Sequence, residues 1–418
     1  MTERVSLGRL WALMLTVFVD MLGFLMVVPI LPLYAKNLGA TAFDVGLMVS
    51  VYAVAQLATS PFWGKLSDRR GRRPMILLGI TISAAANLLF AVACSTWALG
   101  HFDSHHLIGI LYFSRFVQGA GGATTGVVQA YVGDAVIPEE RAKALGWISA
   151  ATSAGVMIGP AIGSLSWAIA PVAPGLIAAA LCVVNFVSAK RFLPESSSHE
   201  ARADARKAPP GAVRRRLAAV LSHPTQPVSR LVWIYGVGMM AFMAMNAILA
   251  LFLQARFGFT EETIGYVYTG IGTISLVMRS IVLGPAVHRL GERGVMRAGL
   301  TSLMLSFALQ PLAPTLPLYL LALVLVPIGT ALLFPATSSL VSRFSQRHEF
   351  GAVMGVQQAY GGVARLVGPV WAGAAFESWG SGSPFWISSI LALATLLFAW
   401  GLEAPRRAKA GAVDQVNG

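Results

Sequence analysis

Two charged residues lie deep inside long apolar stretches of this sequence. Asp20 is the only acid in the stretch 9–34, and Arg115 lies well inside the stretch 107–133. A charge in a hydrocarbon environment costs about 2.5 to 3.5 kcal/mol, so each side chain should line a cavity or find a partner, and Asp20 can instead bind a proton. The chemistry expected is reversible protonation of Asp20 near the permanent charge of Arg115. A purely structural role for either residue stays open.

Further polar side chains in the apolar stretches are candidates for lining a substrate cavity. They are Gln118, Asn246, Gln254, Arg279, Gln357, Gln358 and Arg365. Three arginines against one aspartate give the interior a net positive charge, which suits anionic, zwitterionic or metal-chelated substrates better than lipophilic cations. Arg279 and Arg365 can equally lie at the rims of the cavity, so the charge of the substrate stays open.

The charged segment GKLSDRRGRRP, residues 64–74, separates two apolar stretches. Its glycines permit close backbone approach, and its acid can accept hydrogen bonds at a helix N-terminus, such as that of the stretch 350–376. We expect a latch that is closed in one conformation and released in another. Its members are Gly64, Asp68, Arg69, Gly71, Arg72 and Asp134, the last as an ion-pair partner of Arg72.

A glycine repeat lies in the stretch 143–167. Gly155, Gly159 and Gly163 recur every four residues and so form one bare stripe on a helix, and Pro160 favours a bend. Close helix packing is one expectation. A sealed path that prevents proton leak is the other, and both stay open.

Signatures of catalysis and of bound cofactors are not found in the sequence. It has no GxxxxGK[ST] loop for ATP and no nucleophile triad, so an enzyme is not indicated. The segment GHFDSHH contains His101, Asp103, His105 and His106, which could ligate zinc. Because such loops are usually only solvated, we expect no metal and no cofactor.

The candidate residues require a scaffold that crosses a bilayer. The chain has 418 residues, of which 56% are hydrophobic and 12% charged, and its mean hydropathy is +0.68. These values lie outside the range of soluble globular proteins, and a helix needs about 20 mostly apolar residues to cross a bilayer. The sequence predicts an all-α integral membrane protein. Its twelve predicted transmembrane helices are 9–34, 44–63, 74–98, 107–133, 143–167, 172–192, 229–254, 263–286, 295–312, 316–341, 350–376 and 384–403.

The basic residues predict the orientation of these spans, because cytoplasmic loops retain Lys and Arg. With both termini in the cytoplasm, all but five of the 31 Lys and Arg residues fall on the inner side. The exceptions are Lys36 and Arg256 outside and Arg115, Arg279 and Arg365 within spans. The net charge of +13 therefore belongs to a surface that faces anionic lipid, and a nucleic-acid partner is not expected.

The two halves of the chain repeat each other. Residues 284–293, GPAVHRLGER, match 64–73 at Gly64, Arg69, Gly71 and Arg73, with His288 in place of the acid. Parallel six-helix repeats place a substrate site between them near the midplane of the membrane. We expect two pseudo-symmetric six-helix bundles, with boundaries at 1–192 for the N-terminal bundle, 193–228 for a cytoplasmic linker, 229–403 for the C-terminal bundle and 404–418 for a cytoplasmic tail.

Several motifs occur in the order typical of one transporter family. Asp20 precedes a glycine and two prolines in the first span, GKLSDRRGRRP follows the second, and FSRFVQGAGGA contains Arg115 and Gln118 in the fourth. GVMIGPAIG spans 155–163 in the fifth. On these motifs, residues 9–403 resemble the major facilitator superfamily, and specifically its twelve-span drug/proton antiporters, including the tetracycline/proton antiporters.

This resemblance implies a secondary active transporter that exports small organic molecules in exchange for protons by alternating access. It implies proton coupling through Asp20 and Arg115 and associates GVMIGPAIG with antiport. The partners expected are a small-molecule substrate, protons and the lipid bilayer, in a chain that functions as a monomer in a bacterial inner membrane. The alternatives are an importer, uniporter or flippase for an anionic or amphiphilic metabolite or lipid, and a membrane sensor that transports nothing.

Overall fold

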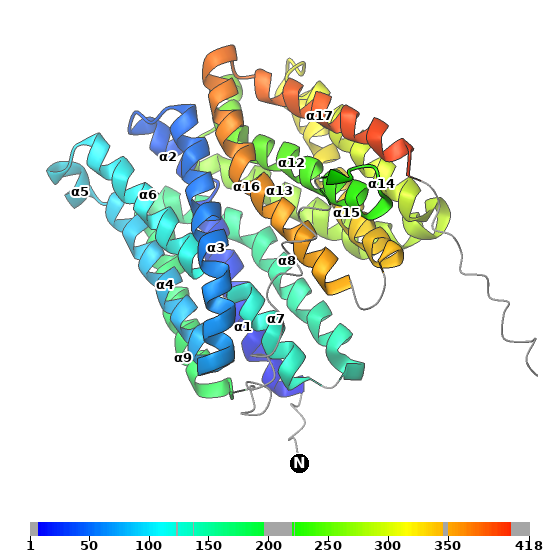
Figure 1. Cartoon of the computed structure of the whole chain (residues 1–418). Helices are drawn as coiled ribbons and strands as arrows, with labels where there is room; N and C mark the ends of the chain where they lie inside the picture. The colour runs from blue at the N-terminus through cyan, green and yellow to red at the C-terminus, as the bar shows by residue number, and fades with distance from the viewer. Residues whose placement is uncertain are drawn as a thin grey trace, which may run out of the picture.

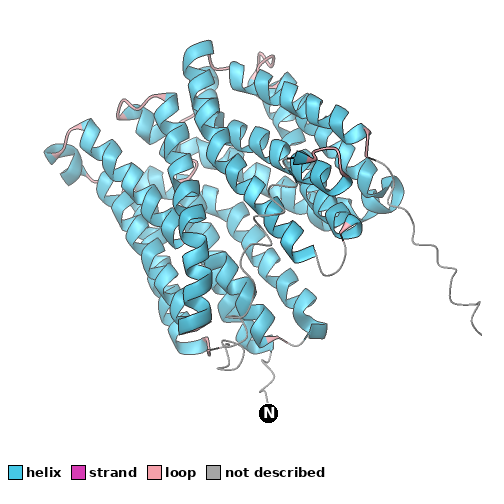
Figure 2. Cartoon of the chain, in the orientation of Figure 1, coloured by secondary structure: helices cyan, strands magenta, loops and turns pink. Residues whose placement is uncertain are grey.

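The computed structural model describes residues 7–122, 124–136, 138–195, 220, 222–345 and 350–402. The regular elements of these residues are all helices, and no strand occurs among them (Figure 2). Each of the twelve predicted spans lies largely in helix, and nine helices of the described residues are long and apolar enough to cross a membrane, which confirms the predicted all-α membrane fold. Most of the predicted linker and the tail 404–418 lie outside the described residues.

The helices fall into two sets of six spans (Figure 1). The first set comprises α1 (Leu7–Val27) with α2 (Leu31–Asn37), α3 (Ala42–Arg70), α4 (Arg72–Ala93), α6 (Ser104–Gly121) with α7 (Thr124–Ala135), α8 (Pro138–Ile169) and α9 (Ala173–Phe192), with the short helix α5 (Thr96–His101) before α6. The second set comprises α12 (Pro227–Phe257), α13 (Glu261–Val277), the π-helical turn η2 (Met278–Val282), α14 (Leu283–Leu309), α15 (Leu316–Phe344), α16 (Phe350–Trp379) and α17 (Ser383–Trp400). The eighth span consists of α13, η2 and the start of α14, and the rest of α14 forms the ninth span.

The first and fourth predicted spans are each formed by two helices rather than one. In the first, α1 ends at Val27 and α2 begins at Leu31. Pro29 and Pro32 lie at this break, and a proline has no backbone N–H to donate within a helix. In the fourth, α6 ends at Gly121 and α7 begins at Thr124.

The repeat predicted from the sequence reappears in the backbone. Gly71 has φ +104° between α3 and α4, and Gly291 has φ +67° within α14. Both positions lie in the region that only glycine adopts without strain. Gly291 therefore divides α14 into the end of the eighth span and the start of the ninth, at the place where Gly71 divides the second span from the third.

Helix pairing repeats in the same way. In the first half, α1 packs against α8 and α9, α3 against α6, and α4 against α9. The corresponding pairs in the second half are α12 with α16 and α17, α13 with α15, and α14 with α17. Between the halves, α8 packs against α13 and α3 against α16, so the two symmetry-related contacts bring the first set of spans against the second (Figure 1).

The glycine stripe of α8 lies against α1. A Cβ at Gly155 would come within 2.7 Å of the Phe18 carbonyl oxygen, and one at Gly159 within 2.8 Å of the Leu22 carbonyl oxygen. At Gly163 it would meet the backbone of Met26. The stripe therefore joins two helices of the first half at backbone contact. The other face of α8 meets α13, where the Pro160 carbonyl lies against Gly265.

Because the Met26 backbone cannot move aside as a side chain can, Gly163→Ala should overpack the contact between α1 and α8. We expect a loss of about 1–3 kcal/mol in the free energy of unfolding, measured as a lower melting temperature in detergent. Gly146→Ala is the control, because a Cβ at Gly146 meets nothing within 4 Å. Equal melting temperatures for the two variants would contradict the packing argument.

Candidate functional site

Asp20 lies on α1 with its side chain half-buried. The Ser83 hydroxyl, from α4, donates a hydrogen bond to Asp20 Oδ1 at 3.3 Å. No ion pair to Asp20 is found within the described residues. The carboxyl group is thus held by one neutral donor and keeps part of its surface accessible.

Arg115, on α6, is 2% exposed and so is fully enclosed by protein. Within the described part of the chain, none of its three guanidinium nitrogens has a hydrogen-bond partner. Gln118, one turn further along α6, is 4% exposed, and its Oε1 also lacks a partner there. A buried guanidinium without a carboxylate is costly, which marks this part of α6 as more than a packing surface.

Tyr52, on α3, lies in the neighbourhood of these groups, although sequence reasoning did not select it. The charged groups in the surroundings of its hydroxyl are Asp20, Arg115 and, from the other half, Arg365. Gln56, one turn along α3, approaches the same hydroxyl at 3.4 Å and donates to the Gly122 carbonyl oxygen at 3.1 Å. The available sequence signal was a tyrosine and a glutamine four residues apart in an apolar span, which places both on one helix face.

Arg365, on α16, is half-buried. The Tyr235 hydroxyl of α12 lies in the surroundings of this guanidinium and is hydrogen-bonded to the side chain of Gln358. Gln358 is exposed and lies two turns before Arg365 on the same helix face. Sequence reasoning selected Arg365 and Gln358 but not Tyr235.

The other polar candidates are dispersed. Gln357 is fully buried and donates to Ser338 Oγ at 3.1 Å, so it lies within the second half between α16 and α15. Asn246 is half-buried on α12. Gln254 lies near the C-terminal end of α12, remote in sequence from the centre of that helix. Arg279 is exposed and lies in η2, and π-helical turns inside α-helices are frequent at functional sites.

We call the end of the bundle that carries residues 64–74 and 284–293 the basic end, and the end that carries α2 and α5 the distal end (Figure 1). At the basic end, Arg72 bridges two acids, with Nη1 2.7 Å from Asp68 Oδ1 and Nε 3.0 Å from Asp134 Oδ2. Arg69 is exposed, and a Cβ at Gly64 would meet nothing within 4 Å. The ion pairs of the expected latch thus lie within the first half.

Glu195, just after α9, is a member of this cluster that sequence reasoning missed. Its carboxylate accepts hydrogen bonds from the backbone N–H groups of Arg72 at 2.8 Å and Arg73 at 3.3 Å. A carboxylate at a helix N-terminus satisfies unpaired donors and favours the helix dipole. The side chain that caps a helix at this motif is therefore Glu195, while Asp68 pairs with Arg72.

The second half has a related cluster. Glu292 lies directly after Gly291, and its Oε2 lies 2.7 Å from Arg343 Nε. The Ser339 hydroxyl donates to Glu292 Oε1 at 2.5 Å. His288, which takes the place of the acid in the repeated motif, is exposed. Each half thus has an acid–arginine pair at the basic end, at different positions of the repeat.

The two halves are joined at the distal end. Asn37 Nδ2 donates to Glu261 Oε1 at 2.7 Å, and the backbone N–H of Ala42 donates to Glu377 Oε2 at 3.0 Å. The Ser164 hydroxyl donates to the Glu261 carbonyl oxygen at 2.5 Å. All hydrogen bonds found between described residues of the two halves lie at this end or near mid-bundle.

At the basic end no hydrogen bond between the two halves is found among the described residues. A Cβ at Gly146 of α8 or at Gly284 of α14 would meet nothing within 4 Å, and Phe62 of α3 is 72% exposed. The hydrogen bonds that join the described parts of the halves therefore lie on the distal side and near mid-bundle.

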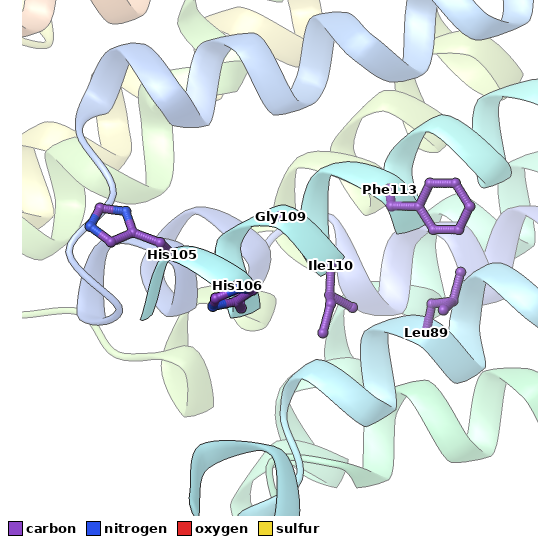
Figure 3. Close-up of a pocket in the computed structure, with 6 residues that line it drawn as sticks. All are labelled: Leu89, His105, His106, Gly109, Ile110 and Phe113. Carbon is purple, nitrogen blue, oxygen red and sulfur yellow. The ribbon is translucent and has the colours of Figure 1, made fainter. Parts of the chain in front are cut away.

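A separate groove of about 550 Å³ lies between α4 and α6 near the distal end (Figure 3). Its lining residues are Leu89, His105, His106, Gly109, Ile110 and Phe113. Phe113 is 55% exposed, whereas Arg115 on the opposite face of α6 is buried. The groove thus opens on the outer surface of the first half and is separate from the interior residues.

The expected solvated histidine segment forms the rim of this groove. His106 donates its backbone N–H and offers its ring Nδ1 to Asp103 Oδ1, at 2.9 and 2.6 Å. These hydrogen bonds hold the pKa of the Asp103 carboxyl below its ordinary value. No group of three or more His, Cys, Asp or Glu residues that could hold a metal ion is found in the part of the chain that the structure describes.

Comparison with known proteins places this architecture in one family. The family model of the Major Facilitator Superfamily matches residues 13–284 and 231–416. The chain is 30% identical over 369 residues to multidrug resistance protein 2 of Bacillus subtilis, covering 87% of this chain and 88% of that protein. It is 26% identical over 362 residues to the class B tetracycline resistance protein of Escherichia coli, with 86% of each chain covered.

The fold comparison agrees. A crystal structure of the nucleoside transporter NupG superposes with a TM-score of 0.73 over 96% of this chain and all of that chain, at 15% identity. Family model, relatives and fold together show that this twelve-span chain belongs to the Major Facilitator Superfamily.

Proposed function

We propose that the chain is a proton-coupled exporter of small organic molecules that works by alternating access. The observation that carries this proposal is Asp20, a half-buried acid inside the first span, held by one hydroxyl and free of ion pairs within the described residues. An acid in the membrane interior lines a cavity, pairs with another group or binds a proton, and without an ion pair Asp20 is suited to bind and release one. Relatives named for multidrug and tetracycline resistance support a drug-like cargo.

The orientation follows from charge. The basic end holds the majority of the described Lys and Arg residues, which supports a cytoplasmic location for this end and for both termini. In a bacterial inner membrane, the hydrogen bonds between the halves then lie on the external side, and we interpret this conformation as inward-facing. Substrate enters between the halves from the cytoplasm, and the contacts of Glu261 and Glu377 close the external side.

Proton coupling in this proposal depends on Asp20 and Arg115, both of which lie in the surroundings of Tyr52. Arg115 keeps its charge at every physiological pH and has no carboxylate partner among the described residues. Loss of the proton from Asp20 leaves a carboxylate that, among the described residues, is held by the Ser83 hydroxyl. Proton binding removes this charge, so we expect the two protonation states to prefer different arrangements of α1 and the helices around it.

The cluster at the basic end serves as the inner gate. In the outward-facing state, the first half would meet the N-terminal end of α16, where Asp68 can accept hydrogen bonds. In the inward-facing state, Asp68 and Asp134 share Arg72 instead. The gate thus exchanges one set of partners for another, so neither state leaves the acids without a cation or donor.

A second candidate function is the export or import of an anionic or amphiphilic metabolite without proton exchange. The observation in its favour is the three arginines of the spans, Arg115, Arg279 and Arg365, against Asp20. Transport that is independent of an imposed pH gradient would favour this candidate.

Asp20→Asn should abolish pH-gradient-driven substrate movement in proteoliposomes, because the amide cannot bind and release a proton. We expect uptake at the level of empty liposomes, with an unchanged melting temperature. Asp103→Asn is the matched control, since Asp103 is exposed and lies outside the spans. Coupled transport by Asp20→Asn at the rate of the control would reject Asp20 as the proton site.

Asp68→Asn should shift the protein toward the inward-facing state, because the outward-facing latch loses its acid. For a partly exposed charge worth roughly 1 kcal/mol, we expect a shift of up to about fivefold in the population ratio. Labelling of a cysteine placed by Gly64→Cys measures inward opening. His288→Asn, at the related position of the second half, should change the ratio far less. Unaltered labelling and transport in Asp68→Asn would exclude the latch.

A further inference from the structure

The distal contact between α13 and the first half buries an acid. Glu261, at the start of α13, is 8% exposed. Asn37, at the end of α2, donates to its Oε1 at 2.7 Å, and the Ser164 hydroxyl of α8 donates to its backbone carbonyl oxygen at 2.5 Å. The same hydroxyl accepts a hydrogen bond from the Gly265 N–H at 2.9 Å. Two helices of the first half therefore hold this one residue of the second half.

No cation pairs with the Glu261 carboxyl among the described residues. Lys36 is exposed on α2, and Arg256, at the end of α12, donates to the Pro311 carbonyl oxygen at 2.8 Å. The titratable groups in the surroundings of the carboxyl, none of which can carry a positive charge, are Glu262, Tyr34 and Cys94. A proton is therefore the ligand that can remove this buried charge.

The contact between α3 and α16, which the internal repeat relates to this one, lacks such a buried acid. There, Glu377 of α16 accepts a hydrogen bond from the backbone N–H of Ala42 at 3.0 Å, but Glu377 is exposed. Water solvates Glu377 while the contact is formed, whereas Glu261 has exchanged water for protein. Of these two acids, Glu261 is thus the one whose solvation depends on the contact between the halves.

The sign of the proton dependence follows from what changes when the distal end opens. Separation of the halves would return Glu261 to water and remove the hydrogen bond from Asn37. Burial disfavours the carboxylate in the closed state, and a single amide donor from another residue offsets only part of that cost. The helix dipole at the start of α13 favours the carboxylate in both states, so it cancels from the comparison. The closed state therefore binds the proton more tightly, and acidification favours it.

We propose that Glu261 is a proton-binding acid of a distal gate formed by Asn37, Ser164 and Glu261, and that it takes up a proton when this gate closes. The inference rests on the alternating access and the orientation proposed above. An acidic exterior then favours closure of the external side, which is the step that carries a proton on Asp20 toward the cytoplasm. An alkaline exterior favours opening. The gate thus responds to the same pH gradient that drives export.

The test measures the closed fraction of the distal end against pH, in the full chain in lipid nanodiscs. Spin labels on Leu99→Cys of α5 and Ser378→Cys of α16 report the distance across this end, because both residues are exposed there. The buried free cysteines, Cys94 and Cys182, are replaced by alanine. Asp20→Asn in every sample removes the titration of the central acid.

We expect the ratio of closed to open molecules to rise about tenfold as the pH falls from about 8 to about 5, as for one proton bound about tenfold more tightly in the closed state. Glu261→Gln should make the ratio independent of pH, because the amide does not titrate. Glu262→Gln is the matched control, since Glu262 is exposed and is the next residue of the same helix. It should keep the dependence.

A second variant tests the same acid if Glu261→Gln fails to fold. Asn37→Ala removes the donor that stabilises the ionised carboxyl in the closed state. It should therefore lower the closed fraction at alkaline pH and enlarge the dependence on pH.

The outcomes separate this inference from the function on which it rests. A ratio that is constant, a ratio that falls on acidification, or a dependence that survives Glu261→Gln would overturn the role of Glu261. Transport by the wild type is measured separately, with cationic, neutral and anionic fluorescent dyes under an imposed pH gradient. If dye transport follows the gradient while the ratio is constant, export stands and the gate falls. If no dye moves while the ratio still depends on pH through Glu261, export fails and the gate stands.

Discussion

The hydrocarbon core cannot solvate a backbone polar group or a charge, and the rest of this structure depends on that constraint. Every described span is helical because a helix satisfies its own N–H and C=O groups. The few breaks occur at Pro29 and at Gly122, where a donor is missing or the helix ends. The same constraint makes each interior charge informative, since no water compensates for a badly placed one.

Without a hydrophobic driving force between helices in lipid, the spans associate through close backbone contact. The glycines of α8 bring it against α1, and Gly265 of α13 lies against the Pro160 carbonyl of the same helix. The helix α8 thus packs against α1 of its own half through one face and against α13 of the other half through a second face. In the proposed alternating access, a movement of the halves repacks the second face of α8 while it preserves the first.

The interior charges lie on helices of both halves. Asp20, Arg115 and Arg365 belong to three helices, and Tyr52 lies in the neighbourhood of all three. The distal contacts of Glu261 and Glu377 join the halves at one end, while Arg72 gathers the acids of the basic end within one half. In the proposed mechanism, a proton or a charged group bound at the centre acts on both ends through these helices.

Composition, spacing and charge bias were sufficient to predict the spans, the internal repeat and the interior charges, because hydropathy and glycine spacing are local properties of the chain. Gly71 and Gly291 occupy equivalent positions of the repeated motif, and both have positive φ, so the repeat in the sequence predicted a repeat in the backbone. The contacts that each polar side chain makes were not predictable from the sequence. Glu195 rather than Asp68 caps α4, and Gln357 is buried within the second half while Gln358 is exposed. Tyr52 and Tyr235 lie near the interior charges although sequence reasoning did not select them. These outcomes depend on how helices rotate and tilt against one another, and that rotation is decided by packing between segments remote in sequence.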